Sequence, residues 1–438
     1  MRIPRPSSLL ACITFVPCIL LSLSSEDGGN GVDDEILQQI NVMMEWLIDE
    51  DGSMDPRIEI RRSNSKDPNS RIGIFVKEAI QTDELLIEIP GEIKIQLDDI
   101  IPKKESDDDG SNDDDSSSDE DKEKASKDYQ DHICKLAWAL RDEYDDEEDS
   151  EFYPYITYLQ LQPFPRVPAM FSTAAQHLLL QTQREIAVRT LDGFEESNDI
   201  VMWPWRLYEE DCIQDDDDEG NSLNPYFITM AVQMGLEHAF VPFYDLVAHH
   251  SDNAKINIFT KPSIFSDEDF GIYASRDLEP GEELFRSYRE CHDCPTGRAD
   301  YLGTPEILRD YGIVEPYPQT FHFDDDIVVI VDEMGEGKYA ARCLNDKCPS
   351  KPMVEARIKD LTGVIAYMMQ TSEPIMENSE YDTINEYHKA LVVAMTTVLP
   401  HCADDPTAVN PPHHPPIRSL EEPATSTNEK DSDKKDEL

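Results

Sequence analysis

Tyr288 closes the stretch DLEPGEELFRSY and is the first residue of this sequence to suggest chemistry. A Pro280-Gly281 turn precedes a short apolar strand in that stretch, and the strand ends at the tyrosine. Leu284 and Phe285 are expected to pack the strand. The phenol either contributes its oxygen to a functional site or is an ordinary strand aromatic whose hydroxyl is satisfied by the fold. The elements around it must decide between these two roles.

Two adjacent histidines, His249 and His250, form a second candidate. Imidazoles are common metal ligands, but neighbouring imidazoles in a loop without a spaced acid are more often structural. Asp245, in the same segment, is expected to accept hydrogen bonds from backbone donors of its own turn rather than to act as a base. We therefore predict no metal site here.

Both ends of the sequence predict a cellular address. Two arginines, an apolar run from Leu9 to Leu23 and small residues follow one another as in a secretory signal peptide, with cleavage near Ser24 or Ser25. The run is shorter than the ~20 residues that a bilayer span needs, so no membrane span is expected. Lys435-Asp436-Glu437-Leu438 matches a receptor-read retention signal of the endoplasmic reticulum. We predict a soluble protein of the reticulum lumen, with the retention receptor as a partner.

An oxidising lumen changes how the cysteines are interpreted. The close pairs Cys291/Cys294 and Cys343/Cys348 favour disulfides, formed within or between the pairs. The segment CHDC could instead offer Cys291, His292 and Cys294 to zinc, with a ligand from the other pair. The mature chain would keep seven cysteines, an odd number that leaves one thiol over: Cys134, Cys212, Cys291, Cys294, Cys343, Cys348 and Cys402.

The 438-residue chain is strongly acidic, with a formal net charge of -54. Acidic runs at Glu105–Lys124, Asp145–Glu151 and Gln214–Gly220 repel themselves and are expected to be solvated loops or disordered segments. Weak calcium buffering or docking of basic partners is the alternative. The sequence has no basic stripe to meet phosphates, so nucleic acid is not an expected partner.

Apolar periodicity predicts a mixed fold. A helix is expected over Asp33–Asp49, followed by short strands. After the acidic insert come helices, then strands again, then a helical region with one hairpin-like run. Strands are predicted at residues 57–61, 71–76, 84–89, 92–96, 255–259, 270–274 and 282–288, and further helices at 131–144, 172–191, 224–239, 354–369 and 381–399. This order excludes a doubly wound sheet and predicts an α+β protein: a small-stranded β core split by a helical insertion, followed by a helical C-terminal domain.

Five segments in this order resemble a SET-domain protein methyltransferase, of the rubisco large-subunit methyltransferase-like type. They are RIGIFVKEAIQTDELLIEIP, SEFYPYITYLQLQPFP, VPFYDLVAHHSDNAKINI, GIYASRDLEPGEELFRSY and TPEILRDYGIVEPYP, and the resemblance covers roughly residues 33 to 400.

The resemblance implies transfer of a methyl group from S-adenosylmethionine to a side-chain nitrogen of a protein or peptide substrate. That nitrogen belongs to lysine or, as the second choice, to histidine, in a non-histone protein of the secretory pathway. By resemblance Tyr288 is the catalytic phenol, which with backbone carbonyls orients the methyl by weak C–H···O contacts. Tyr311 would line the substrate channel. Five residues of two segments would bind the cofactor: Ile72, Gly73, Ile74, Ala248 and His249.

Three positions depart from the family pattern. Arg71 replaces the first glycine of a Gly-x-Gly turn, Ala248 replaces an asparagine, and Thr229-Met230 is the nearest match to a Ser-Arg pair. Each lost polar contact would cost about 1–3 kcal/mol. Arg71 could instead turn to the carboxylate of the cofactor. These departures favour a second hypothesis, a SET-fold peptide-binding module without methyl transfer. The acidic runs support a third, a lumenal protein that acts through calcium or chaperones.

We therefore expect seven segments along the chain. They are a signal peptide (1–25), an N-terminal helix and first SET half (33–100), an acidic disordered insert (101–130), a helical SET insertion (131–240), a second SET half (241–295), a helical substrate-binding-like domain (296–404) and a disordered tail (405–438).

Overall fold

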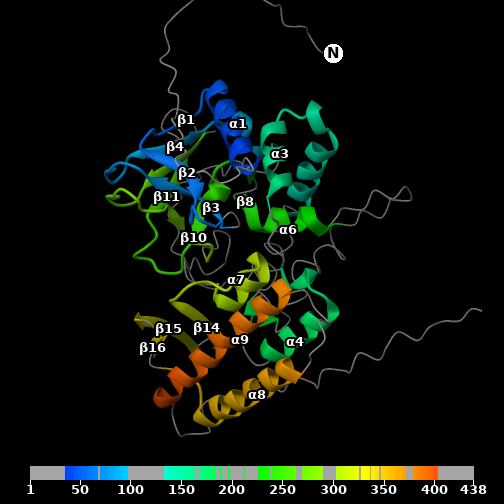
Figure 1. Ribbon diagram of the computed structural model, residues 1–438, viewed down its shortest axis with the longest axis vertical. Helices are drawn as coiled ribbons and strands as arrows, with labels where there is room; N and C mark the ends of the chain where they lie inside the picture. Colours follow the sequence, from blue (N-terminus) through cyan, green and yellow to red (C-terminus); the bar gives the residue numbers. More distant parts are fainter. Residues whose placement is uncertain are drawn as a thin grey trace, which may run out of the picture.

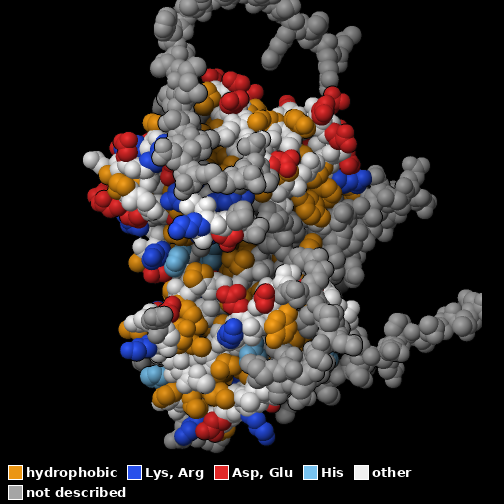
Figure 2. All heavy atoms as spheres, viewed as in Figure 1, with side chains coloured by type: hydrophobic (Ala, Val, Ile, Leu, Met, Phe, Trp, Pro, Cys, Tyr) orange, Lys and Arg blue, Asp and Glu red, His pale blue; other side chains and the backbone are white. Residues whose placement is uncertain are grey.

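The computed structural model describes residues 35–67, 70–96, 133–162, 167–183, 188–189, 196–197, 212, 225–236, 239–262, 269–289, 302–324, 327–335, 337–344, 347–370 and 378–402. The described residues form two lobes with separate apolar cores (Figure 1). The upper lobe of Figure 1 holds the N-terminal helix and most of the small sheets, and the lower lobe holds the C-terminal helices. Acidic side chains gather at the outer end of the first lobe on the face in Figure 2.

The first lobe begins with helix α1 (Glu35–Asp49). Its buried residues Ile40, Met43 and Leu47 recur at spacings of three and four, which places them on one face of the helix. This face packs into the first core beside α3 (Tyr153–Leu161), and Gln39 Nε2 donates to the Pro154 carbonyl at 2.7 Å. The predicted helix over Asp33–Asp49 is thus observed from Glu35 onward.

Short strands build the β part of the first lobe. They are β1 (Ser53–Met54), β2 (Ile58–Arg62), β3 (Ile72–Val76), β4 (Leu85–Ile89), β5 (Ile95–Gln96), β8 (Gly235–Leu236), β9 (Ala239–Phe240), β10 (Ala248–His249), β11 (Ile258–Pro262), β12 (Phe270–Ala274) and β13 (Phe285–Arg286). Within the described residues one sheet has the order β1-β4-β12-β11, a second β5-β9-β8, and β2 pairs with β3. All of these pairings are antiparallel. In addition, β10 pairs with β13, and this pairing is parallel.

Helices inserted between the two strand groups serve both lobes. A helix over residues 133–145, α3 and α6 (Pro225–Met234) pack into the first core, while α4 (Thr173–Gln183) packs into the second. A disulfide from Cys134 to Cys212 ties the insertion together. The helix predicted over 172–191 ends at Gln183, and residues 188–189 form strand β6, which pairs with β7 (Glu196–Ser197).

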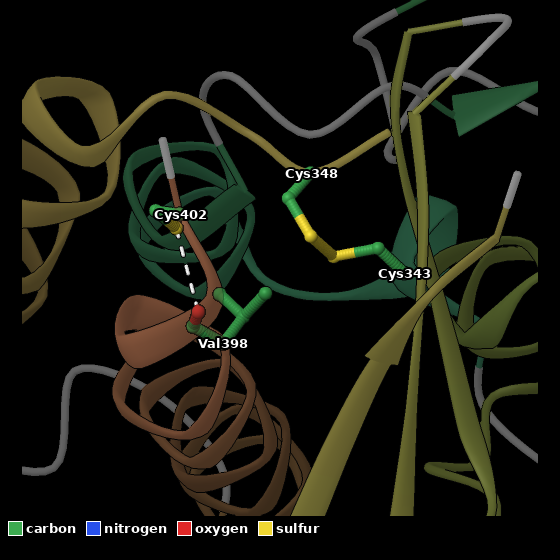
Figure 3. The surroundings of a disulfide bond; sticks show 4 residues. All are labelled: Cys343, Cys348, Val398 and Cys402. Carbon is green, nitrogen blue, oxygen red and sulfur yellow. Dashed lines mark hydrogen bonds between the residues drawn. A yellow bond between two sulfur atoms is a disulfide. The ribbon is translucent and has the colours of Figure 1, made fainter. Parts of the chain in front are cut away.

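The second lobe combines helices with a sheet. Its elements are α7 (Thr304–Tyr311), β14 (Gln319–Asp324), β15 (Ile327–Gly335), β16 (Lys338–Cys343), α8 (Lys351–Gln370) and α9 (Asn378–Val398). The three strands form an antiparallel meander that packs against α9. Cys343, the last residue of β16, forms a disulfide with Cys348, and Cys402 donates to the Val398 carbonyl nearby (Figure 3).

These elements confirm the predicted α+β class, with a small-stranded core interrupted by helices and followed by a largely helical region. The hairpin-like run of the sequence becomes β15, the central strand of the second lobe's sheet. Across the described parts of the chain, every helix is too short or too polar to cross a bilayer.

Candidate functional site

Tyr288 lies two residues beyond β13, where that strand runs beside β10. The turn before the strand depends on Gly281, which has a φ of 90° and donates its N–H to the Val76 carbonyl at 2.7 Å. Leu284 is fully buried and donates to the Ile74 carbonyl, which fixes the strand against β3. The turn and the strand thus deliver Tyr288 to one place in the first lobe.

Both ends of Tyr288 are held by hydrogen bonds. Its hydroxyl donates to the Val247 carbonyl at 3.1 Å, and its backbone N–H donates to His249 Nδ1 at 3.0 Å. The phenol ring stacks on the His249 ring at a centroid distance of 5.0 Å and lies 4.5 Å from the Tyr311 ring. Burial raises the pKa of Tyr288, although the charge of Arg286 opposes this rise. The hydroxyl therefore stays protonated at neutral pH.

Tyr311 reaches the site from the second lobe. Helix α7 begins after Gly303, whose N–H donates to the Glu306 carboxylate at 2.8 Å, and ends at Gly312 with a φ of 70°. Tyr311 is the last residue of the helix, and burial raises its pKa as well. The two tyrosines that the sequence assigned to catalysis and to the substrate channel are in direct contact.

His249 joins the two lobes through a buried acid. Because Nδ1 accepts the Tyr288 amide, the ring must carry its proton on Nε2, which donates to Glu315 at 2.9 Å. Glu315 also accepts from Arg289 Nε at 3.0 Å and from the Thr304 hydroxyl at 2.5 Å. Burial alone would raise the pKa of Glu315, but Arg289 and His249 hold it below its usual range. Both ring nitrogens of His249 are used, so this histidine is a positioning group rather than a metal ligand.

Arg286 places a cation among the tyrosines. Its guanidinium carbon lies 4.0 Å from the centre of the Tyr244 ring and 4.4 Å from that of Tyr288. Such distances are typical of cation–π contacts. The arginine was not among the residues singled out from the sequence.

Asp245 lies beside this cation without a hydrogen bond. Both carboxylate oxygens are buried, and neither has a hydrogen-bonding partner, as is also true of the Tyr155 hydroxyl. Burial raises the pKa of Asp245 to about 7, against the opposing attraction of the Arg286 charge. The expectation that Asp245 meets backbone donors of its own turn stays a prediction: the amides of Asp245 and Leu246 act to lower the pKa of the carboxyl, although neither forms a full hydrogen bond with it.

Strand β3 approaches the same place from the other half of the sequence. Gly73 pairs with Arg61 of β2, Ile72 is half-buried, and Ile74 is fully buried in the first core. The neighbouring Phe75 forms a bridge with Glu283, the residue before Leu284. Ala248, on β10, pairs with Phe285. The two segments predicted to bind the cofactor therefore both contact residues 283–285. Strand β3 contacts Glu283 and Leu284, and strand β10 pairs with Phe285.

Comparison of the sequence with protein-family models identifies the family of this chain. The family model for the SET domain matches residues 71–289, half of the chain. The chain belongs to the SET-domain family. This confirms the family predicted from the sequence, and the matched segment ends one residue after Tyr288.

Solved structures of the rubisco methyltransferase LSMT are similar to this chain. The structure of LSMT bound to AdoMet has 10% identity and a TM-score of 0.44, and the similarity covers 83% of this chain and 91% of that one. The LSMT SET domain bound to lysine and AdoHcy has 11% identity and a TM-score of 0.41, with 83% and 90% covered. The corresponding complex with methyllysine has 11% identity and a TM-score of 0.43, with the same coverage. No curated protein matches the sequence.

Metal candidates are resolved only in part. Cys343 and Cys348 are joined within their own pair, so their thiolates are not available to zinc, while Cys291 and Cys294 lie outside the described residues. His250 Nδ1 accepts the amide of Asp252 at 3.0 Å, and burial lowers the pKa of His250. In the part of the SET protein that the structure describes, no three His, Cys, Asp or Glu side chains are grouped to hold a metal.

Other sequence candidates lie in helix α6 or outside the described residues. Thr229 and Met230 are buried in α6, and Met230 belongs to the first core. The acidic runs 105–124 and 214–220 lie outside the described residues, as do both terminal address signals.

Sequence reasoning missed Arg286, Glu315 and Arg289 at this site. Arg286 and Arg289 flank Tyr288 within three residues, so their proximity to the motif was the available signal. Glu315 follows Tyr311 by four residues and carried no such signal until the second lobe was placed against the SET core.

Proposed function

We propose that this SET protein is a methyltransferase that transfers a methyl group from S-adenosylmethionine to a lysine side chain of a protein, with histidine as the second choice of acceptor. The observation that carries the proposal is the meeting of β3, β10 and Tyr288 within the SET-domain match. Ile72, Gly73 and Ile74 of β3 and Ala248 and His249 of β10 would hold the cofactor, mainly through their backbone.

S-adenosylmethionine would supply a methyl group already activated on a sulfonium. The chain then needs chiefly to align the acceptor nitrogen and to support shifting charge. Tyr288 suits this task because hydrogen bonds at its amide and its hydroxyl fix its ring. Backbone carbonyls such as that of Val247, which accepts the Tyr288 phenol, would supply weak C–H···O contacts to the methyl group.

The acceptor nitrogen must be neutral, and Arg286 favours that form. A lysine ammonium about 5 Å from this guanidinium would be repelled by about 3 kcal/mol at an effective dielectric constant of about 20. The repulsion lowers the pKa of an entering amine, so its free form is more populated. Asp245, which accepts no hydrogen bond in the structure, is the neighbouring group able to take up the released proton.

The test is methyl transfer by the full chain and its Y288F variant. Radiolabelled S-adenosylmethionine is supplied with an extract of lumenal proteins, and methyllysine and methylhistidine are identified by mass spectrometry. We expect Y288F to lower transfer by about 100-fold while calorimetric binding of S-adenosylmethionine stays within about twofold. Y153F, at an exposed tyrosine of α3, is the control. Equal transfer by wild type and Y288F would contradict the catalytic assignment.

A second candidate is a peptide-binding module that has lost methyl transfer. Arg71 and Ala248 favour it, because they depart from the family pattern in the two segments where the cofactor would bind. Calorimetry distinguishes the two functions. No binding of S-adenosylmethionine at millimolar concentration, together with peptide ligands recovered by display selection, would support the module.

We further propose that the protein resides in the lumen of the endoplasmic reticulum. Two disulfides among the described residues, Cys134–Cys212 and Cys343–Cys348, support this because such bonds persist in oxidising compartments. A reporter fused after Gly28 should enter the secretory pathway, and removal of residues 435–438 should release the protein into the medium. Retention of the reporter in the cytosol would contradict the address.

A further inference from the structure

Arg71 and Glu283 form an ion pair between residues 212 positions apart. The contact is bidentate: Arg71 Nη1 donates to Glu283 Oε1, and Nη2 donates to Oε2 at 2.8 Å. The arginine side chain is 48% exposed, whereas that of Glu283 is 11% exposed. Arg71 immediately precedes β3, and its guanidinium carbon also lies 5.7 Å from the centre of the Phe285 ring.

The ion pair lies directly over Gly73. A Cβ atom at this glycine would overlap Glu283 Oε1 and would lie 3.3 Å from Arg71 Nη1. The absent side chain thus makes room for the carboxylate against the backbone of β3. The backbone of Glu283 is held on two sides, by its bridge to Phe75 and by Asn257 Nδ2, which donates to its carbonyl at 2.8 Å. The pair therefore fills the place where the sequence predicts the methionine part of the cofactor to approach.

We propose that Arg71 and Glu283 are a clasp for the amino-acid end of S-adenosylmethionine, which opens by exchange of ion-pair partners. On binding, the Arg71 guanidinium takes the α-carboxylate of the cofactor, and the Glu283 carboxylate takes its α-ammonium. This rests on the proposed function, because it assigns residues to the cofactor of that reaction.

Charge complementarity supports the exchange. The amino-acid end is a zwitterion, and an arginine–glutamate pair carries the same two charges, so the exchange leaves no charge unpaired. The planar guanidinium suits a carboxylate through two parallel N–H···O bonds. Arg71 can exchange partners because its side chain is half-exposed, and the enclosed Glu283 carboxylate keeps a cation beside it when the α-ammonium of the cofactor replaces the guanidinium. The clasp would replace the polar contacts that the family pattern assigns to positions occupied here by Ala248 and by the buried Thr229 and Met230.

Calorimetry with three ligands tests the clasp on the full chain. S-adenosylmethionine has both charges, decarboxylated S-adenosylmethionine lacks the carboxylate, and methylthioadenosine lacks the whole amino-acid end. Wild type should bind S-adenosylmethionine at least 10-fold more tightly than the decarboxylated analogue. R71M should lose at least 10-fold in affinity for S-adenosylmethionine and less than twofold for the other two ligands. E283Q should lose affinity for both amine-bearing ligands and keep that for methylthioadenosine.

The neighbouring ion pair of Arg276 and Glu282 offers a matched control. Both of its side chains are partly exposed, and Glu282 directly precedes Glu283. R276M should bind all three ligands as wild type does. Equal affinity of wild type for S-adenosylmethionine and its decarboxylated analogue would overturn the clasp, and this comparison requires no variant to fold. An equal loss of all ligands in R71M would overturn it too. If wild type binds methylthioadenosine as tightly as S-adenosylmethionine, the clasp is wrong but the proposed function stands. If wild type binds none of the three ligands, the proposed function itself is wrong.

Discussion

Replacing Asp245 with asparagine should flatten the pH dependence of stability. Burial raises the pKa of this carboxyl from 3.8 to about 7, so the folded protein binds its proton more tightly than the unfolded chain does. The stabilisation is complete below pH 3.8 and is lost as the pH rises through 7. Linkage over this range gives a loss of about 4 kcal/mol in total, of which about 2–3 kcal/mol falls between pH 5 and pH 8.

The asparagine side chain has nearly the same shape as aspartate but does not titrate, so D245N should not lose stability between pH 5 and pH 8 in this way. Scanning calorimetry at pH 5, 6, 7 and 8 measures the difference in unfolding midpoint between the two proteins. A stability change of 1 kcal/mol corresponds to roughly 2–4 °C for domains of 150–250 residues. The midpoint of D245N minus that of wild type should therefore rise by roughly 5–10 °C from pH 5 to pH 8. E279Q, at an exposed acid, should give a constant difference. A constant difference for D245N as well would mean that Asp245 is already ionised at pH 5, and the reasoning from burial would fail.

Three further changes test other parts of the molecule. C134S opens the disulfide to Cys212, which closes a loop across a sequence separation of 78; we expect a loss of about 4 kcal/mol by chemical unfolding, whereas C402S, at a free thiol, should match wild type. E315Q leaves a buried arginine without its anion and should cost about 3–5 kcal/mol. Because the folded pKa of Glu315 is lowered, wild type alone should lose the corresponding stability as the pH falls below 4.5, and parallel acid-unfolding curves would contradict this. R286M removes the cation over the tyrosines and should raise the affinity for a lysine-containing substrate peptide at pH 7 by about 10- to 100-fold; an unchanged affinity would contradict the repulsion.

Local patterns in the sequence predict much of the site. The strand around Gly73 and the turn at Gly281 are specified by nearby residues, because β-type alternation and a positive φ are local properties. The order of the motifs also identifies the SET family, and it brings Tyr288 and Tyr311 under consideration before any contact between them is known. Helix limits are predicted less well, as α4 shows by ending at Gln183.

Charged partners could not be predicted in the same way. Arg286 reads as an ordinary strand residue until the parallel pairing of β13 with β10 aims it at two tyrosine rings. Glu315 likewise gains its role only when the second lobe packs against His249. The partner of each charged side chain depends on the tertiary fold, which local sequence patterns do not specify.

By itself, then, the sequence determines the class of fold and the family, because these follow from periodicity and from motifs that are contiguous in the chain. The catalytic role of Tyr288 stays a prediction. Only the tertiary structure decides that Arg71 is paired with Glu283 and that Asp245 is buried without a hydrogen bond. The physical reason is that burial and ion pairing depend on distances in space between residues that are remote in sequence.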